Sequence, residues 1–165
     1  MRLAREKICG RPDAARQVVE WKRARCRVVF TNGCFDLLHP GHVHYLEKAR
    51  SLGDKLVVAV NDDPSVSRIK GAGRPIQPAR ERAEVLAALA AVDLVTLFEE
   101  PDPLNIIREL LPDILVKGAD WSMDAIIGRD VVESAGGRVQ QIELEPEYST
   151  TWLIDSIRKN YCPPS

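Results

Sequence analysis

Short runs of apolar, often β-branched residues alternate with helical patterns along this 165-residue chain, and that alternation constrains the fold most strongly. The runs lie at 27–32, 55–61, 92–98, 113–118 and 138–144, and each has the length and composition of a strand. Most are apolar on both faces, as expected of strands that helices cover on two sides. The pattern predicts an α/β fold built on a five-stranded parallel sheet.

The intervals between the runs carry helical patterns. One helix is expected to begin at Pro40, a favoured first helical residue, and to end before Gly53. The others are expected at 78–92, 102–112, 123–137 and 149–161, with a leading helix at 13–24 packed outside the sheet. With helices on both faces, the sheet would be doubly wound and Rossmann-like. Because no repeat or linker interrupts the chain, we expect one domain overall, with an N-terminal helical extension at 1–26 and the main domain at 27–165.

Composition narrows the functional classes. The 23 basic and 24 acidic residues give a net charge of −1, whereas nucleic-acid-binding proteins usually carry a basic excess. No apolar run approaches the roughly 18–20 residues of a membrane span, and the N-terminus lacks the apolar core of a secretory signal. The cysteines form no C-x-x-C pair, which is typical of reduced thiols; they are Cys9, Cys26, Cys34 and Cys162. We therefore expect a cytoplasmic protein that binds neither nucleic acid nor a membrane.

All the histidines lie within "HPGHVH", between the first predicted strand and the helix that begins at Pro40. Parallel sheets bind ligands at the carboxyl ends of their strands, often at a helix N-terminus. His39 would lie at the N-cap and His42 one turn later, so both side chains can face an anion that the helix dipole also attracts. Gly41 lacks a Cβ and would let a phosphate approach the backbone. His44 falls on another helical face and is expected to have no role in the site.

A metal site is the competing interpretation of these histidines. It would need a third ligand at a recognisable spacing, and the chain has none and no H-E-x-x-H motif. We therefore predict a phosphate-binding histidine pair and no protein-bound metal.

The segment "TNGCFDLLHPGHVHYLEKARSLGD" resembles the first motif of the cytidylyltransferase-like nucleotidyltransferases, whose hallmark is H-x-G-H. Three further segments, at 60–78, 113–121 and 145–158, resemble the D-glycero-D-manno-heptose 1-phosphate adenylyltransferases of ADP-heptose and lipopolysaccharide core synthesis. The resemblance covers about 27–160; Ala119 departs from it, since a second glycine would be expected there. In many bacteria that domain is fused to a sugar kinase, and the length of this chain suggests the stand-alone form.

The resemblance implies transfer of AMP from ATP to a sugar 1-phosphate, with release of pyrophosphate and with Mg²⁺ that arrives bound to ATP. It implies that 27–165 is a nucleotidyltransferase domain, that the catalytic residues are His39, His42 and Lys70, and that the partners are small-molecule substrates. We also expect a homodimer or a higher homo-oligomer. The expected nucleotide-binding residues are Asn32, Gly33, Cys34, Phe35, Gly41, Lys117, Gly118, Asp120, Ser149, Thr150 and Thr151. The expected acceptor-binding residues are Asn61, Asp63 and Arg74.

Each of these segments also has a structural interpretation. "IKGAGRP" is a basic, glycine-containing loop suited to phosphates, and equally an ordinary surface loop. The hydroxyls of "YSTT" could bind phosphates or cap the last helix. Asn61 and Asp63 could form a turn before Pro64, and Asp120 could cap one. Asp36 is expected to orient a loop or a histidine, while Arg82 could reach the site or pair with a neighbouring glutamate.

Two other functions stay open. A glycerol-3-phosphate cytidylyltransferase would share H-x-G-H, but its last motif resembles R-T-x-G-I-S-T-T, and "EPEYSTT" lacks that arginine. A non-catalytic nucleotide-binding module is the alternative outside enzymes. Cys34 is not expected to be a nucleophile, because no base stands beside it in the sequence.

Overall fold

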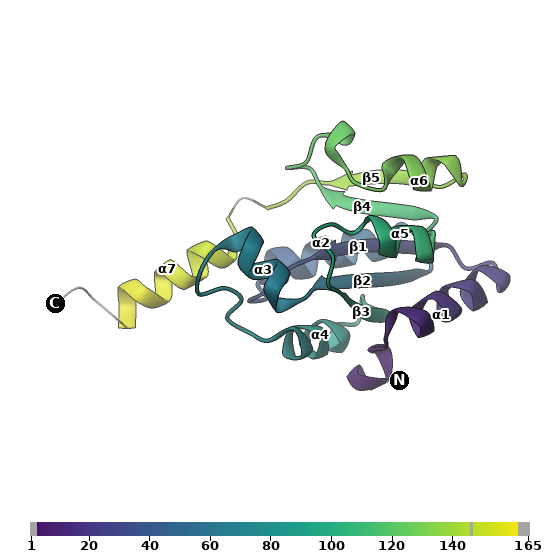
Figure 1. Cartoon of the computed structure of the whole chain (residues 1–165). Coiled ribbons are helices and arrows are strands. Elements are labelled where there is room, and N and C mark those ends of the chain that lie inside the picture. Colours follow the sequence, from purple (N-terminus) through teal and green to yellow (C-terminus); the bar gives the residue numbers. More distant parts are fainter. Residues whose placement is uncertain (1–2, 146, 162–165) are drawn as a thin grey trace.

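A five-stranded sheet forms the centre of the computed structural model, which describes residues 3–145 and 147–161 (Figure 1). The strands are β1 (Val28–Gly33), β2 (Lys55–Asn61), β3 (Leu94–Phe98), β4 (Ile114–Gly118) and β5 (Arg138–Ile142). Their order is β3-β2-β1-β4-β5, and all neighbouring pairs are parallel. The predicted Rossmann-like α/β class is confirmed.

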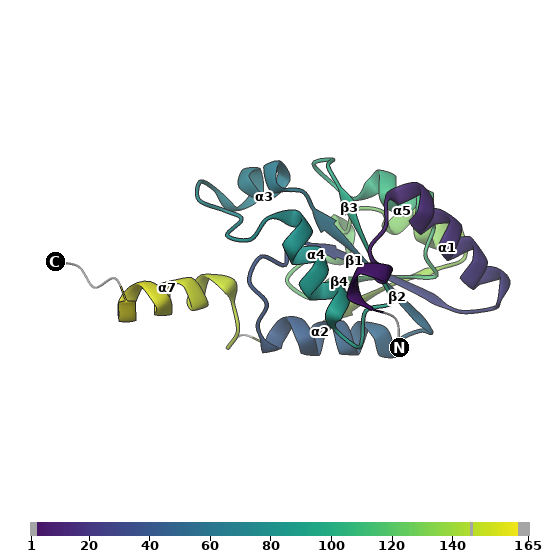
Figure 2. The same ribbon diagram turned by 90° about the horizontal axis from the view of Figure 1, so that it is seen from below.

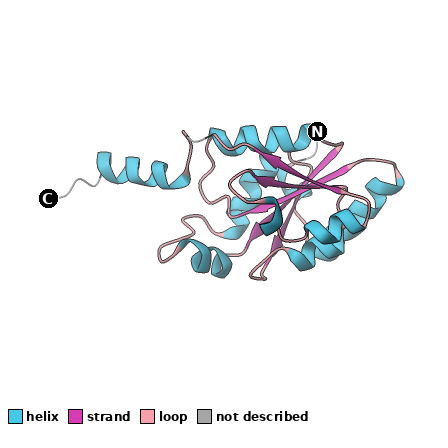
Figure 3. Cartoon of the chain, turned by 90° about the horizontal axis from the view of Figure 1, so that it is seen from above, coloured by secondary structure: helices cyan, strands magenta, loops and turns pink. Residues whose placement is uncertain are grey.

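Helices cover both faces of this sheet, as Figure 3 makes clear. They are α1 (Arg11–Arg23), α2 (Pro40–Ser51), α3 (Asp63–Lys70), α4 (Ala79–Ala88), α5 (Leu104–Leu110), α6 (Arg129–Ser134) and α7 (Thr150–Tyr161), with 3-10 turns at Ala4–Lys7 and Met123–Ala125. One core cluster joins the sheet to α2 and α4, and the other joins it to α1, α5 and α6. Along β2, Val58 packs in the first cluster and Val57 in the second, because successive side chains of a strand point to opposite faces.

The predicted start of the second helix is confirmed in detail. His39 is the N-cap, with an extended backbone at φ −143°, and Pro40 is the first residue of α2. Gly53 follows the helix end, where an added Cβ would lie 2.7 Å from Val29 Cγ2 and 2.8 Å from the Arg27 carbonyl oxygen. The return from α2 into β2 therefore needs a glycine for close packing.

Two segments differ from the predicted elements. Residues 63–70 form α3, which the sequence analysis missed; the Asp62 carboxylate caps it by accepting a hydrogen bond of 2.8 Å from the Ser65 N–H. The helix expected at 123–137 is broken at Gly128, whose φ is +89° and whose added Cβ would lie 2.6 Å from Ile107 Cδ1. Only 129–134 of that stretch is α-helical.

The N-terminal segment completes one face of the sheet. Ala14 and Val18 of α1 are buried in the second core cluster, and Ile8 forms a parallel bridge with Val95 of β3. The division of the chain at residue 26 stays a prediction. No helix in the described part of the chain combines the length and the apolar character that crossing a bilayer would require.

Candidate active site

A cavity of about 550 Å³ opens at the carboxyl ends of β1 and β4, the two neighbouring strands at which the strand order reverses. This reversal is where open α/β sheets generally bind ligands. Every residue predicted for the site lines the cavity except Asp63. The structure thus brings together side chains from β1, β2, α2, α3, β4 and the start of α7.

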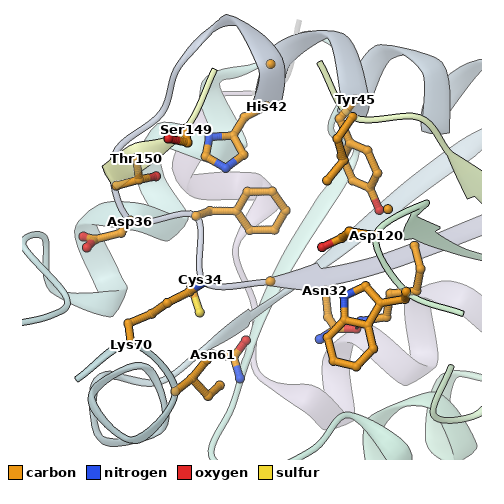
Figure 4. A pocket seen from close by; sticks show the side chains of 18 of the residues that line it. Asn32, Cys34, Asp36, His42, Tyr45, Asn61, Lys70, Asp120, Ser149 and Thr150 are labelled. Carbon is orange, nitrogen blue, oxygen red and sulfur yellow. The ribbon is translucent and has the colours of Figure 1, made fainter. Parts of the chain in front are cut away.

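His39 and His42 stack against each other at the start of α2. Their ring centroids lie 3.7 Å apart with an interplanar angle of 22°, and His42 faces the cavity in Figure 4. Burial lowers the pKa of both imidazoles, and for His42 burial together with the neighbouring His39 lowers the pKa to about 4. Both rings are therefore neutral at pH 7. Within the described residues, neither buried Nδ1 atom has a hydrogen-bond partner.

Gly41 makes room for this stack. An added Cβ would lie 3.2 Å from His39 Nδ1 and 3.0 Å from Tyr148 Cβ. The space that the missing side chain leaves is thus filled on two sides, by an imidazole and by the segment that leads into α7.

Asp36 fastens the loop that follows α3. Its carboxylate accepts hydrogen bonds from the N–H groups of Ile76 (2.8 Å) and Gln77 (3.0 Å) and from Arg74 Nε (2.5 Å). Burial acts to raise the pKa of Asp36, but these donors outweigh it and hold the pKa below its ordinary value. Asp36 orients a loop, as predicted, and Arg74 is anchored to it while also lining the cavity.

Lys70 is the last residue of α3 and an exposed cation at the cavity. Among the described residues, no acid or carbonyl pairs with its ammonium group. Gly71 and Gly73 follow with φ of +92° and +81°, values that glycine adopts without strain. The Lys70 ammonium is therefore available to a bound anion.

A second lysine lies at the floor of the cavity. Lys117 Nζ donates a hydrogen bond of 2.5 Å to Asn32 Oδ1, bridging β4 and β1, and lies 5.8 Å from the centre of the Trp121 ring. Burial lowers the pKa of Lys117 to about 8, with Asp120 acting in the opposite direction. Lys117 thus stays largely protonated at pH 7 although it is half-buried.

Several cavity residues were not predicted. An apolar wall on the β4 and β5 side is formed by Trp121, Ile126, Ile127 and Leu144, and further lining side chains are Tyr45, Asp102, Glu145 and Tyr148. Trp121 could have been found from its place directly after Asp120. Tyr45, Glu145 and Tyr148 lie within segments that carry the family resemblance but were not selected, whereas Asp102, Ile126, Ile127 and Leu144 lie outside those segments.

The hydroxyls at the start of α7 differ in what they bond. Ser149 Oγ accepts a hydrogen bond of 3.0 Å from the Trp152 N–H, and Thr150 Oγ1 donates a long one of 3.4 Å to the Leu37 carbonyl oxygen. Thr151 Oγ1 has no hydrogen-bond partner among the described residues. The preceding segment is tied to α2 by a hydrogen bond of 2.8 Å between His44 Nδ1 and Glu145 Oε2. His44 is therefore not idle, although it lies outside the cavity.

Asp63 has a structural role in the fold. Its carboxylate pairs with Arg82 at 2.7 Å, which corrects the expectation that Arg82 reaches the site or pairs with a glutamate. The Arg82 guanidinium also donates hydrogen bonds to the carbonyl oxygens of Gln77, Cys34 and Asn61. Burial raises the pKa of the Cys34 thiol, so that it stays protonated at pH 7, which a nucleophile would not.

The neutral histidine pair, two lysines and a helix start surround a switch-point cavity, and groups of these kinds suit the binding of a phosphate. Within the described residues, no three His, Cys, Asp or Glu side chains are grouped so as to hold a metal ion. The chain belongs to the cytidylyltransferase-like family, which matches residues 30–161.

Among similar proteins is a bifunctional protein HldE from Acidiphilium cryptum, 53% identical over 155 residues that cover 94% of this chain and 32% of that protein. Another, from Gluconobacter oxydans, is 57% identical over 142 residues, which are 86% of this chain and 30% of that protein. The chain thus spans about a third of these relatives. A solved structure, a lipopolysaccharide core biosynthesis protein from Thermoplasma volcanium, is 32% identical with a TM-score of 0.60, covering 73% of this chain and 97% of that one.

Proposed function

We propose that the protein is an adenylyltransferase that transfers AMP from ATP to D-glycero-D-manno-heptose 1-phosphate, forming ADP-heptose and pyrophosphate. The observation that carries the proposal is the stacked, neutral His39–His42 pair at the start of α2, with Lys70, which has no ion-pair partner among the described residues, across the same cavity. The bifunctional HldE proteins, of whose length this chain spans about a third, support the assignment of one of their activities to the matched region. The lipopolysaccharide core protein of similar structure supports a sugar acceptor.

In the proposed reaction, an oxygen of the sugar phosphate attacks the α-phosphorus of ATP. The bond between this phosphorus and the bridging oxygen to the β-phosphate breaks, and its electrons leave with pyrophosphate. No covalent enzyme intermediate is needed, because the acceptor phosphate is already an anionic nucleophile. Catalysis then consists of positioning the reactants and stabilising the charge that builds on the equatorial and leaving oxygens.

The histidine pair suits that task while it is neutral. An unpartnered buried N–H is costlier than an unpartnered lone pair, so the buried Nδ1 atoms favour protonation at Nε2. Each ring can then donate one hydrogen bond from Nε2 to a phosphate oxygen. Lys70 would neutralise charge on the same phosphate, and the start of α2 adds its dipole.

The rest of ATP can be assigned to two other parts of the cavity. The hydroxyls and N–H groups at the start of α7 would bind the β- and γ-phosphates, with Thr151 supplying a hydroxyl that has no described partner. The apolar wall of Trp121, Ile126, Ile127 and Leu144 would receive the adenine. Lys117 and Asn32, which bond each other beneath it, would fix the ribose end.

We further propose that Mg²⁺ arrives bound to ATP, since this ion keeps most of its waters and is often held mainly by substrate phosphates. Asp36 is unsuited to it, because both of its oxygens already accept hydrogen bonds. The use of ATP and a phosphorylated sugar supports a cytoplasmic location. We also propose a homodimer or higher homo-oligomer, which the mass of the purified protein by light scattering would test.

Pyrophosphate release by the purified protein tests the function. Each nucleoside triphosphate is combined with heptose 1-phosphate, other sugar 1-phosphates and glycerol 3-phosphate, with and without Mg²⁺. We expect turnover with ATP and heptose 1-phosphate. Turnover with CTP and glycerol 3-phosphate alone would refute the proposal, and tight ATP binding without turnover would indicate a non-catalytic module.

A further inference from the structure

The cavity has a third arm that ATP does not occupy in the proposed function. It lies where β2 and β3 end side by side, since Asn61 pairs with Phe98 in the sheet. The cavity residues of this arm are Asn61, Ile69, Pro101, Asp102 and Pro103, and Lys70 and Arg74 line the same cavity. In Figure 4, Asn61 and Lys70 lie on the side of the cavity away from His42 and Tyr45.

Asn61 offers this arm a fixed acceptor. The residue is buried, with 4% of its surface exposed, and its Nδ2 donates a hydrogen bond of 3.1 Å to Ser65 Oγ. The backbone carbonyl oxygen of Asn61 accepts a hydrogen bond of 2.8 Å from the Arg82 guanidinium, which fixes the backbone at this position. No described residue donates to Asn61 Oδ1, so this atom is left for a ligand.

Asp102 offers a second acceptor, and a charged one. Its Oδ1 accepts a hydrogen bond of 2.8 Å from the Leu104 N–H, and it stands between two prolines, of which Pro103 is buried. No described donor reaches its Oδ2. Pro103 restricts the backbone of Asp102, and the bond from Leu104 holds the carboxylate in place before any ligand arrives.

The charged residues around the arm determine how a ligand would be oriented in it. A phosphate is attracted to Lys70 and Arg74 and repelled by Asp102, whereas sugar hydroxyls are good donors to a carboxylate. A polyhydroxy phosphate would therefore enter with its phosphate toward Lys70 and its hydroxyls toward Asp102 and Asn61. That orientation presents the phosphate to the histidine pair.

We propose that this arm is the acceptor subsite, and that Asp102 determines specificity by accepting hydrogen bonds from hydroxyl groups of the sugar. The inference rests on the proposed function and adds to it a residue that the sequence analysis did not select. It replaces Asp63, whose carboxylate is taken by Arg82.

The test is Asp102→Asn, since an asparagine can still accept the hydrogen bond from Leu104 and keep the loop folded. We expect the KM for heptose 1-phosphate to rise about 10-fold to 100-fold, the usual cost of losing a hydrogen bond to a charged group. The KM for ATP should change less than about twofold. Glu99→Gln is the matched control, because it removes the same charge from the same loop at an exposed residue that does not line the cavity.

Acceptors that lack single hydroxyl groups make the test sharper. With the analogue that lacks the hydroxyl bound by Asp102, the wild type and Asp102→Asn should have the same KM, because the interaction is already gone. With the other deoxy analogues, the ratio between the two proteins should persist. Asp102→Ser, which also retains a capping oxygen, should repeat the pattern.

Three results would overturn the inference: an unchanged KM for the acceptor, an equal rise in the KM for ATP, or a uniform ratio across all the deoxy analogues. If the wild type fails to turn over any acceptor, the proposed function falls separately. Calorimetric binding of heptose 1-phosphate to the wild type and to Asp102→Asn then decides: weaker binding by the variant supports the acceptor subsite, and equal affinities overturn it.

Discussion

Helices α2 and α7 both begin at the cavity, yet the fold holds them very differently. Each has 12 residues, but α2 buries Tyr45, Leu46 and Ala49 against the sheet, whereas α7 buries none. Figure 2 shows α7 projecting away from the body of the protein. A helix of this length is marginal in water when nothing packs against it.

This difference in packing matches the different roles that the proposed function gives to the two helices. The imidazoles that would act on the reacting phosphorus lie on the packed helix, where side chains are held in one arrangement. The hydroxyls assigned to the β- and γ-phosphates lie at the start of α7, where Thr150 bonds the Leu37 carbonyl oxygen and the preceding segment bonds α2 through Glu145 and His44. In the proposed function, a fixed reaction centre would thus be combined with a phosphate-binding segment that can adjust to its ligand.

Substitution of the histidines at the start of α2 is expected to have the largest effect on activity. His42→Ala and His39→Ala should each lower kcat by about 10²-fold to 10³-fold, comparable to losing one donor of an oxyanion hole. The KM for ATP should change far less, because the interaction forms mainly in the transition state. Steady-state kinetics measure both. Zinc retained by the wild type and lost from the variants, with activity restored by Zn²⁺ alone, would indicate a metal site instead.

Substitutions on α2 and on α7 should differ in their effect on the free energy of unfolding as clearly as in their effect on activity. Leu46→Ala removes a fully buried side chain of α2 and should lower the free energy of unfolding by about 2–5 kcal/mol in urea titrations. Ile157→Ala on exposed α7 should change it by less than about 0.5 kcal/mol. A larger loss at Ile157 that depends on protein concentration would mean that a second copy of the chain covers α7.

Acidic pH should lower the stability of the fold through His42 on α2. The folded pKa of His42, about 4, lies below the ordinary value of 6.5, so its stabilising contribution is complete above pH 6.5. That contribution is lost as the pH falls from 6.5 toward 4, by up to about 3 kcal/mol for the shift of His42. Urea titrations at several pH values measure it. In His42→Asn this pH dependence should largely disappear; an unchanged slope would show that other groups cause it.

The hydroxyls of α7 should have a smaller effect, and a different one. Thr151→Val should raise the KM for ATP about tenfold, the value of one hydrogen bond to a charged group, with little change in kcat. Thr151→Ser keeps the hydroxyl and should restore the wild-type KM. A fall in kcat at unchanged KM would place Thr151 at the reaction centre instead.

The smallest effect concerns the tie between the two helices. In the His44–Glu145 pair, 44% and 36% of the side chains are exposed, and such pairs contribute about 0–1 kcal/mol. His44→Ala should therefore raise the KM for ATP by less than about fivefold and leave kcat unchanged. Glu145→Gln should match it. A kcat defect as large as that of His42→Ala would contradict the phosphate-pair interpretation.

The sequence predicted what local patterns specify. The buried strands were visible as apolar runs, and the start of α2 as Pro40 followed by glycine and histidine at helical spacing. The motifs located most of the cavity because parallel strands end at one edge. Helix α3 was not predicted because the glycines that follow it favour a loop. Asp62 and Pro64 nevertheless form a recognisable helix start.

Other residues could not be found in this way. Asp102 reaches the cavity only through the strand order and the path of the chain, which no local pattern encodes. The use of Asp63 was unpredictable for the same reason, since its partner Arg82 lies a helix away on α4. The break at Gly128 depends on a contact with Ile107 in a different helix.

The buried Arg82 has a consequence for how such a site can change over generations. It holds the end of β2 and two loops through the backbone carbonyl oxygens of Asn61, Cys34 and Gln77, and every residue type carries a backbone carbonyl oxygen. Substitution of the side chains at these positions would leave the hydrogen bonds to the arginine in place. Descendants of this protein could therefore exchange the residues that contact the acceptor, and acquire new substrates, while one invariant cation keeps the loops where they are.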